Sequence, residues 1–200
     1  MRYATILIPI ALLFLGGCSS TTTPPIKEYT IYPSSGKSSL SKPMSSKTLR
    51  VMSPKAPPSL SGRELLYLRE NGEIGNYLYT RWSDVPSSLI ERSLIHTLQE
   101  KKLFATLLNS TSSAQADILL ESDLSAFYHR LEGEQESYGV IDITYRLIDA
   151  KTKLPIASKR FYITKLSPTQ NGQGGVKALD DATRELTHQC TQWILQEIKP

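Results

Sequence analysis

The chain has 200 residues, a formal net charge of +4, and 21% charged against 40% hydrophobic residues. This length suits one domain with a proper core and a flexible lead, and two separate domains would be cramped. Lys and Arg are scattered among acidic residues without a dense basic run. The sequence therefore shows no patch of the kind that nucleic-acid binding needs.

The first 17 residues have the features of an export signal. Arg2 is followed by an apolar segment that is too short to span a bilayer as a helix, which needs roughly 20 apolar residues. The segment Leu15-Gly16-Gly17-Cys18 fits a bacterial lipobox, with two small residues before the thiol. We therefore predict a lipoprotein signal peptide over residues 1–17, with Cys18 as the acceptor of a diacylglycerol thioether and of a further acyl chain such as palmitate.

The predicted lipidation places the protein at a membrane. One acyl chain holds a protein only marginally, at roughly 0.8 kcal/mol per buried methylene, whereas two or three chains make the attachment effectively permanent. Ser19 stands where the inner-membrane retention signal of many Gram-negative bacteria has Asp. This favours the periplasmic face of the outer membrane. The alternative interpretation is that Cys18 is an ordinary thiol behind an uncleaved anchor.

The second cysteine, Cys190, has no partner for an internal disulfide once Cys18 carries lipid. It lies on the apolar face of the last predicted helix, where a buried structural thiol is expected rather than a nucleophile.

Polar segments follow the lipidated cysteine. Residues 18–27 contain Ser, Thr and Pro and predict a flexible tether, which at about 3.3 Å per residue would reach up to about 30 Å from the bilayer. Residues 28–33 suit an edge strand. The Ser-, Pro- and Lys-rich residues 33–47 predict a long disordered loop, and the alternating residues 48–54 predict a half-buried strand.

A hairpin and a helix come next. Residues 64–82 predict two strands joined at Asn71-Gly72, a dipeptide that takes the positive φ angles of a tight turn. The helix predicted over residues 86–102 begins at Pro86, which suits a first turn. Its apolar side chains recur at i, i+4 and i+8 and should face a sheet; they are Ile90, Leu94 and Leu98.

The remaining elements alternate between strands and links. Apolar–polar alternation predicts strands in residues 103–108, 116–128 and 138–164, the last of these a hairpin. Residues 129–137 predict a charged turn. Residues 167–175, with three glycines, predict a flexible link.

Residues 176–199 form the last predicted helix. Its buried stripe consists of Leu179, Ala182, Leu186, Cys190, Trp193 and Ile194. The order of elements predicts a single domain over residues 28–200 of the α+β or three-layer α/β class, in which a mixed β-sheet carries two amphipathic helices on one face.

The sequence offers no catalytic or metal-binding cluster. His96, His129 and His188 are far apart and lack the spacing of metal ligands. It contains no GxSxG, Walker or dinucleotide-binding motif. We therefore predict no catalytic residues, metal or cofactor. Tyr67, Tyr77, Tyr79 and Trp82 crowd around one hairpin and could form an exposed aromatic surface, although tyrosines more often pack within strands.

Three segments around this hairpin carry a resemblance to a known family. A lipobox is followed by KEYTIYP, then by LRVMSPKAPPSL, and then by LLYLRENGEIGNYLYTRWSDVP, which closes on Tyr-x-Tyr-x-Arg-Trp before a Pro-started helix. From Lys27 to Ile198 the chain resembles the ABC-type transport auxiliary lipoproteins, PqiC-like proteins that accompany MCE (mammalian cell entry) lipid transporters. The long loop 33–47 departs from the family pattern.

The resemblance implies a non-enzymatic accessory subunit of a lipid transport system. Its partners would be a periplasmic MCE protein and, through it, an inner-membrane permease and ATPase. We expect an exposed strand edge or the surface around Tyr77, Tyr79 and Trp82 to dock the MCE protein.

The sequence leaves one other function open and disfavours another. A pilotin or assembly lipoprotein would escort an outer-membrane secretin or barrel. A periplasmic hydrolase is disfavoured because the sequence lacks a paired nucleophile and base.

Overall fold

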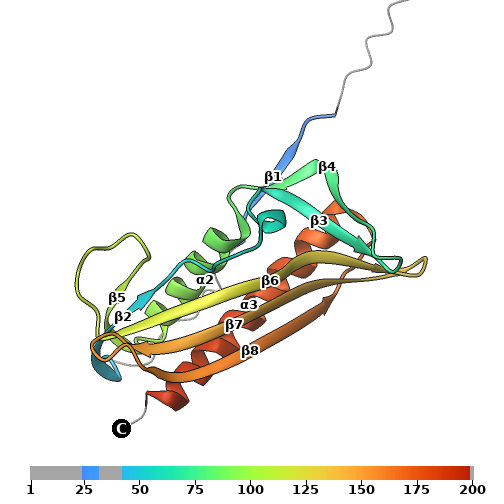
Figure 1. Ribbon diagram of the computed structural model, residues 1–200. Coiled ribbons are helices and arrows are strands. Elements are labelled where there is room, and N and C mark those ends of the chain that lie inside the picture. Colours follow the sequence, from blue (N-terminus) through green and yellow to red (C-terminus); the bar gives the residue numbers. More distant parts are fainter. Residues whose placement is uncertain (1–23, 32–41, 199–200) are drawn as a thin grey trace, which may run out of the picture.

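The computed structural model describes residues 24–31 and 42–198 (Figure 1). The described residues form one eight-stranded mixed sheet and two long helices, which lie on the same face of the sheet. The predicted α+β architecture is confirmed. The predicted signal peptide, Cys18 and most of the predicted tether lie outside the described residues, as do residues 32–41 of the predicted edge strand and loop.

The elements follow one another along the chain with the following bounds. They are β1 (Lys27–Tyr29), β2 (Ser45–Val51), the short 3-10 helix η2 (Pro58–Leu60), β3 (Glu64–Arg69), β4 (Ile74–Trp82), α2 (Pro86–Glu100), β5 (Phe104–Leu108), β6 (Ile118–Glu132), β7 (Glu136–Asp149), β8 (Pro155–Leu166) and α3 (Gly172–Glu197).

Strand β6 organises the sheet. Along one edge it pairs antiparallel with β7, which pairs in turn with β8. The opposite edge is shared, because β2 pairs parallel with the start of β6 and β3 pairs parallel with its end. Strand β5 continues the sheet beyond β2, and β4 and β1 continue it beyond β3. The sheet therefore divides into two wings, and the wing of β3, β4 and β1 carries the amino-terminal end of the described chain.

The β6–β7 hairpin is longer than the sequence predicted. The ladder continues through His129↔Gly139 to Glu132↔Glu136, so the charged turn predicted over residues 129–137 shrinks to residues 133–135. The prediction was wrong because charged side chains can also occupy the exposed face of a strand. One face of this antiparallel pair is open to solvent, where a strand accommodates charges.

The two helices match their predicted apolar rows. Pro86 occupies the start of α2, and Ile90, Leu94 and Leu98 are fully buried, as predicted. The stripe predicted for the last helix is also buried, including Cys190. Helix α2 packs on α3 and β5, and α3 covers β6, β7 and β8.

Helix α3 begins earlier than predicted. Gly172 is its first residue, and the Asn171 side-chain oxygen caps it by accepting from the Gly174 N–H at 3.0 Å. The predicted flexible link is therefore wrong in its glycine-rich part. Gly175 is buried, and a Cβ there would lie 2.8 Å from Nδ1 of His129. Because glycine has no side chain, the start of α3 can lie close to the sheet. The local sequence indicates only that glycines are flexible, and it does not predict this close contact.

Part of the predicted loop 33–47 is also strand. Residues 45–47 begin β2, where Ser45 pairs with Phe104 of β5. Their side chains are polar because this end of β2 is largely exposed, so apolar alternation is absent there.

Candidate functional site

The structure divides the predicted aromatic surface between the core and the solvent. Trp82 is 0% exposed, and its ring centroid lies 5.5 Å from that of Phe127 beneath the helices. The expectation that Trp82 is exposed is therefore wrong. Alternation along β4 separates two faces, but it does not say which face the helices cover. Of the three predicted partner-binding residues, Tyr79 is the exposed one, at 42%.

Tyr77 faces inward and joins two strands. Its hydroxyl lies 2.8 Å from Nδ1 of His129, and its ring stacks edge-on with Tyr67 at 5.3 Å between centroids. Burial lowers the pKa of His129 to about 4 and raises the pKa of Tyr77 to about 12. Both side chains are therefore neutral at neutral pH. This uncharged, hydrogen-bonded pair links β4 to β6 beneath the first turn of α3.

A bulge gives β4 its exposed side chains. From Asn76 to Arg81, β4 advances five positions, whereas its partner β3 advances only two, from Leu66 to Glu64, so three residues of β4 are unmatched. Such bulges bend a strand and re-aim its side chains. The bend is visible at the top of the domain in Figure 1.

The bulge carries an exposed apolar surface, which we name the β4 apolar patch. Leu78 is 74% exposed and Tyr79 is 42% exposed. Strand β1 pairs parallel with β4 in the register Lys27↔Thr80, which places Ile26 level with Tyr79. Ile26 is itself 51% exposed. The patch consists of Ile26, Leu78 and Tyr79.

A second surface lies on the face of the sheet that the two helices leave uncovered. We name it the outer tyrosine cluster, and it consists of Tyr128, Arg130, Tyr138 and Tyr162. Arg130 donates to the Tyr162 hydroxyl at 3.0 Å and lies 5.5 Å from the Tyr138 ring centroid. The registers of β6, β7 and β8 bring these side chains together.

Part of the outer tyrosine cluster is shielded from solvent. Val140 of β7, which pairs with Tyr128, is 0% exposed although it lies on the uncovered face. Burial, with Tyr162 nearby, raises the pKa of Tyr128. At the margin of the cluster Tyr162 and Leu166 are 51% and 66% exposed. The result is a fixed aromatic surface with an arginine at its centre.

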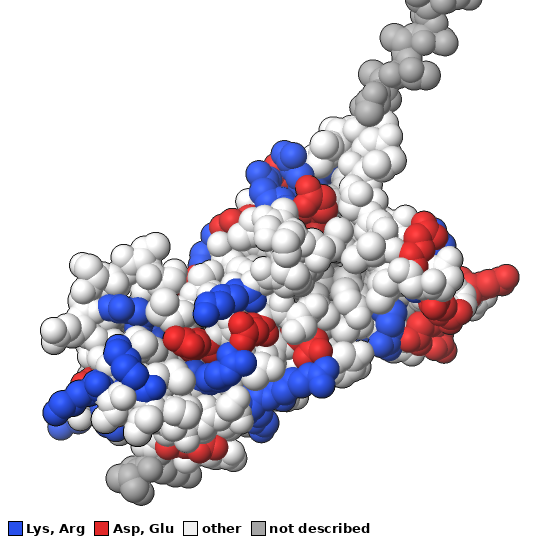
Figure 2. All heavy atoms as spheres, in the orientation of Figure 1, with Lys and Arg blue, Asp and Glu red and all other residues white. Residues whose placement is uncertain are grey.

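Charges are distributed unevenly around this cluster (Figure 2). On the same face, Arg160 binds Asp142, the cross-strand neighbour of Tyr162, through two contacts of 2.8 and 2.6 Å, and farther along Arg146 pairs with Asp123. The turns of the β3–β4 and β6–β7 hairpins are acidic, and the Gly133 N–H donates to Glu70 across them. The acidic side chains in or next to these two turns are Glu70, Glu73, Glu132, Glu134 and Glu136.

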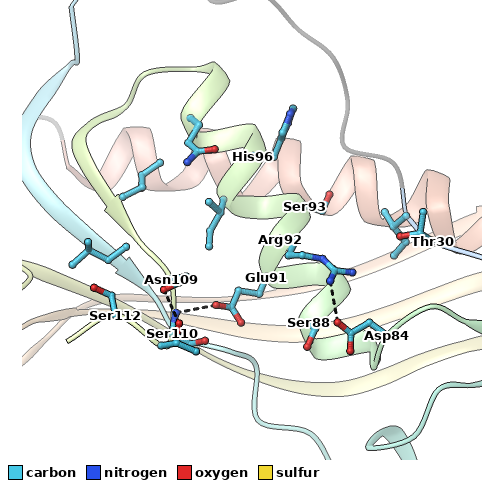
Figure 3. Close-up of a pocket in the computed structure, with 16 residues that line it drawn as sticks. Thr30, Asp84, Ser88, Glu91, Arg92, Ser93, His96, Asn109, Ser110 and Ser112 are labelled. Atoms are coloured by element: carbon cyan, nitrogen blue, oxygen red, sulfur yellow. Dashed lines mark hydrogen bonds and ion pairs between the residues drawn. The ribbon is translucent and has the colours of Figure 1, made fainter. Parts of the chain in front are cut away.

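A groove lies between α2 and the end of β5 (Figure 3), with a volume of about 970 Å³. Its charged groups are engaged with one another or with the backbone. Arg92 pairs with Asp84 at 2.9 Å, and the buried Glu91 accepts from the Ser110 N–H at 2.9 Å. These contacts hold the loop after β5 against the helix.

The described residues contain no group of three His, Cys, Asp or Glu side chains placed to hold a metal ion. His96 and His188 lie on separate helices, and His129 is buried. Burial raises the pKa of Cys190, so this side chain remains a protonated thiol. Within residues 24–31 and 42–198, neither helix combines the length and apolarity needed to cross a bilayer.

Sequence analysis missed the outer tyrosine cluster. Tyr128 ends one predicted strand and Tyr138 begins the next, with Arg130 inside the predicted turn between them. The alternation of side chains along the strand continues through Tyr128 and Arg130, but the many charged residues between positions 129 and 137 obscure it in the sequence.

These features define an α+β domain whose candidate sites are open surfaces. The chain belongs to the family of ABC-type transport auxiliary lipoprotein components, whose family model matches residues 29–190. It is similar in structure to a Xanthomonas campestris protein, with 18% identity, a TM-score of 0.77, and coverage of 86% of this chain and 95% of that one.

A second solved structure, of an uncharacterized protein, matches with 14% identity and a TM-score of 0.66 over 86% of this chain and 99% of that one. Both likenesses concern the fold alone. No curated protein matches the chain.

Proposed function

We propose that this chain is an outer-membrane-anchored periplasmic lipoprotein, a non-enzymatic accessory subunit of an MCE-type ABC lipid transport system that docks the MCE protein at the membrane. The observation that carries the proposal is the family match over residues 29–190. The lipobox ending at Cys18 supports the anchor. An inner-membrane ATPase would supply the energy, so the domain itself needs to hold and position its partner.

The outer tyrosine cluster is the surface best suited to docking. Tyrosine and arginine dominate the binding energy of many protein interfaces, and they do so best where they are preorganised and partly dry. Arg130 is held by the Tyr162 hydroxyl and by an ion pair with Glu132 at 2.6 Å. Little side-chain freedom therefore remains to be lost on binding.

Charge complementarity indicates the kind of surface that the partner presents. Five glutamates lie in or next to the two hairpin turns beside the cluster, and two of them, Glu73 and Glu132, pair with Arg69 and Arg130. Opposite charges across an interface speed association and fix its register. We therefore expect the docking surface of the MCE protein to carry basic residues around an apolar centre.

Co-purification tests the proposal. The wild-type lipoprotein, extracted in detergent, should recover the MCE protein, and Tyr162→Ala should lose most of it. Ile156→Ala is the matched control, because Ile156 lies at the other end of β8 and is 43% exposed. This control should recover the MCE protein as the wild type does.

Two results would contradict the proposal. One is failure of the abundant, intact wild type to recover the MCE protein. The other is recovery of a secretin or barrel in its place, which would favour an assembly lipoprotein. Mass spectrometry of the mature amino terminus should in addition find acyl chains on Cys18.

A further inference from the structure

We infer that the β4 apolar patch lies on the surface of the bilayer that holds the acyl chains of Cys18, and that it sets the orientation of the domain on the membrane. The inference rests on the lipid anchor of the proposed function. It assigns Tyr79 to lipid, where sequence analysis predicted a protein partner.

The exposure of the patch is built into the sheet. The three unmatched residues of β4 create the bulge, and Leu78 and Tyr79 project from it rather than into the core. Thr80 and Trp82, the next inward positions, are fixed beneath them by the start of α3 and by Phe127. The bulge therefore keeps Leu78 and Tyr79 exposed, while the contacts of Thr80 and Trp82 hold β4 against the core.

The position of the patch along the chain points to the membrane. Strand β1 runs beside the patch and continues towards the amino terminus (Figure 1). Ile26 is eight residues from Cys18 in the sequence. Even a fully extended chain of eight residues spans at most about 28 Å. Attachment at this distance gives the patch a high effective concentration of lipid, so even a weak apolar contact becomes populated.

The side chains suit the bilayer interface. Ile26 and Leu78 supply aliphatic surface, and Tyr79 has an apolar ring with a polar tip, the type of side chain that gathers at membrane interfaces.

Two other surfaces are less suited to this role. The outer tyrosine cluster lies on β6, β7 and β8, on the broad face of the sheet, whereas the amino-terminal strand β1 pairs with β4. The groove beside α2 is concave and contains the Arg92–Asp84 ion pair and the Glu91 carboxylate. The β4 apolar patch is thus the exposed apolar surface that adjoins the anchored end of the chain.

Site-directed spin labelling tests this inference on the full chain, expressed with its signal segment and reconstituted in vesicles of phosphatidylethanolamine and phosphatidylglycerol. Cys190 is buried with a raised pKa, and Cys18 carries lipid, so an introduced cysteine is the one thiol open to the label. Nitroxides at Leu78→Cys and Tyr79→Cys are compared with one at Ile156→Cys, the control position on β8.

On the vesicles, the labels at positions 78 and 79 should lose collisions with a water-soluble nickel complex and gain collisions with oxygen. The label at position 156 should remain open to the nickel complex. If the protein floats with the vesicles but labels 78 and 156 are equally open to nickel, the inference is overturned while the anchor stands.

Two further outcomes also overturn it. Protection of position 78 only after addition of the MCE protein would make the patch a protein-docking surface. Failure of the wild type to float with the vesicles would refute the lipid anchor, and the inference with it.

Discussion

Lowering the pH from 7 to 4 should cost the domain about 3 kcal/mol of stability through one side chain, His129. Burial lowers the pKa of His129 to about 4 in the folded protein. In the unfolded chain a histidine titrates near 6.5, and each pKa unit corresponds to about 1.4 kcal/mol. The difference of about 2.5 units therefore gives about 3 kcal/mol.

The direction of the effect follows from the two pKa values. Between about pH 4 and pH 6.5 the unfolded state binds the proton and the folded state does not, so stability falls as the pH falls. The stabilisation is fully present above about pH 6.5 and is lost once the pH reaches about 4. Burial is the cause of the shift, and no acidic group offsets it. The ring is 0% exposed, with Gly175 of α3 close beside it.

Urea unfolding between pH 4 and pH 7 measures this contribution. His129→Gln should be less stable than the wild type at pH 7, because Tyr77 loses its partner, but it should lose about 3 kcal/mol less than the wild type on acidification. His188→Gln is the control for removal of an exposed histidine on α3, and its pH profile is compared with that of His129→Gln. Parallel pH profiles for the wild type and His129→Gln would refute the reasoning.

Two further predictions concern packing. Gly139→Ala places a Cβ 2.6 Å from the carbonyl carbon of Ala178 in α3, and it should lower stability by about 2–3 kcal/mol and the melting temperature by about 5–10 °C. Gly133→Asn, at a turn with open space and a φ of +55°, should cost far less, and equal losses would contradict the close approach. Trp82→Ala should cost about 3–5 kcal/mol in urea unfolding, because the ring is fully buried, whereas the exposed Tyr79→Ala should stay within about 0.5 kcal/mol. A larger loss at position 79 than at position 82 would contradict the placement of both rings.

Local periodicity predicted most of the secondary structure. The rows of α2 and α3 recur at helical spacing, and the β7–β8 hairpin alternates at a period of two, so each could be identified without knowledge of its neighbours. Asn71-Gly72 also marked its turn correctly, because Gly72 takes a φ of +83° that few other residues adopt. The lipobox and the family resemblance were likewise carried by short segments of sequence.

The tertiary structure decided which face of each strand is covered. Trp82 and Tyr79 have similar surroundings in the sequence, yet one is core and the other is solvent-exposed, because α3 covers one face and a bulge turns the other side chain outward. The tyrosines of the outer cluster come from strands that meet only through the pairing of β6, β7 and β8. Sequence by itself determined the elements and the predicted anchor. The surfaces depended on contacts between distant segments, which a local pattern of residues does not encode.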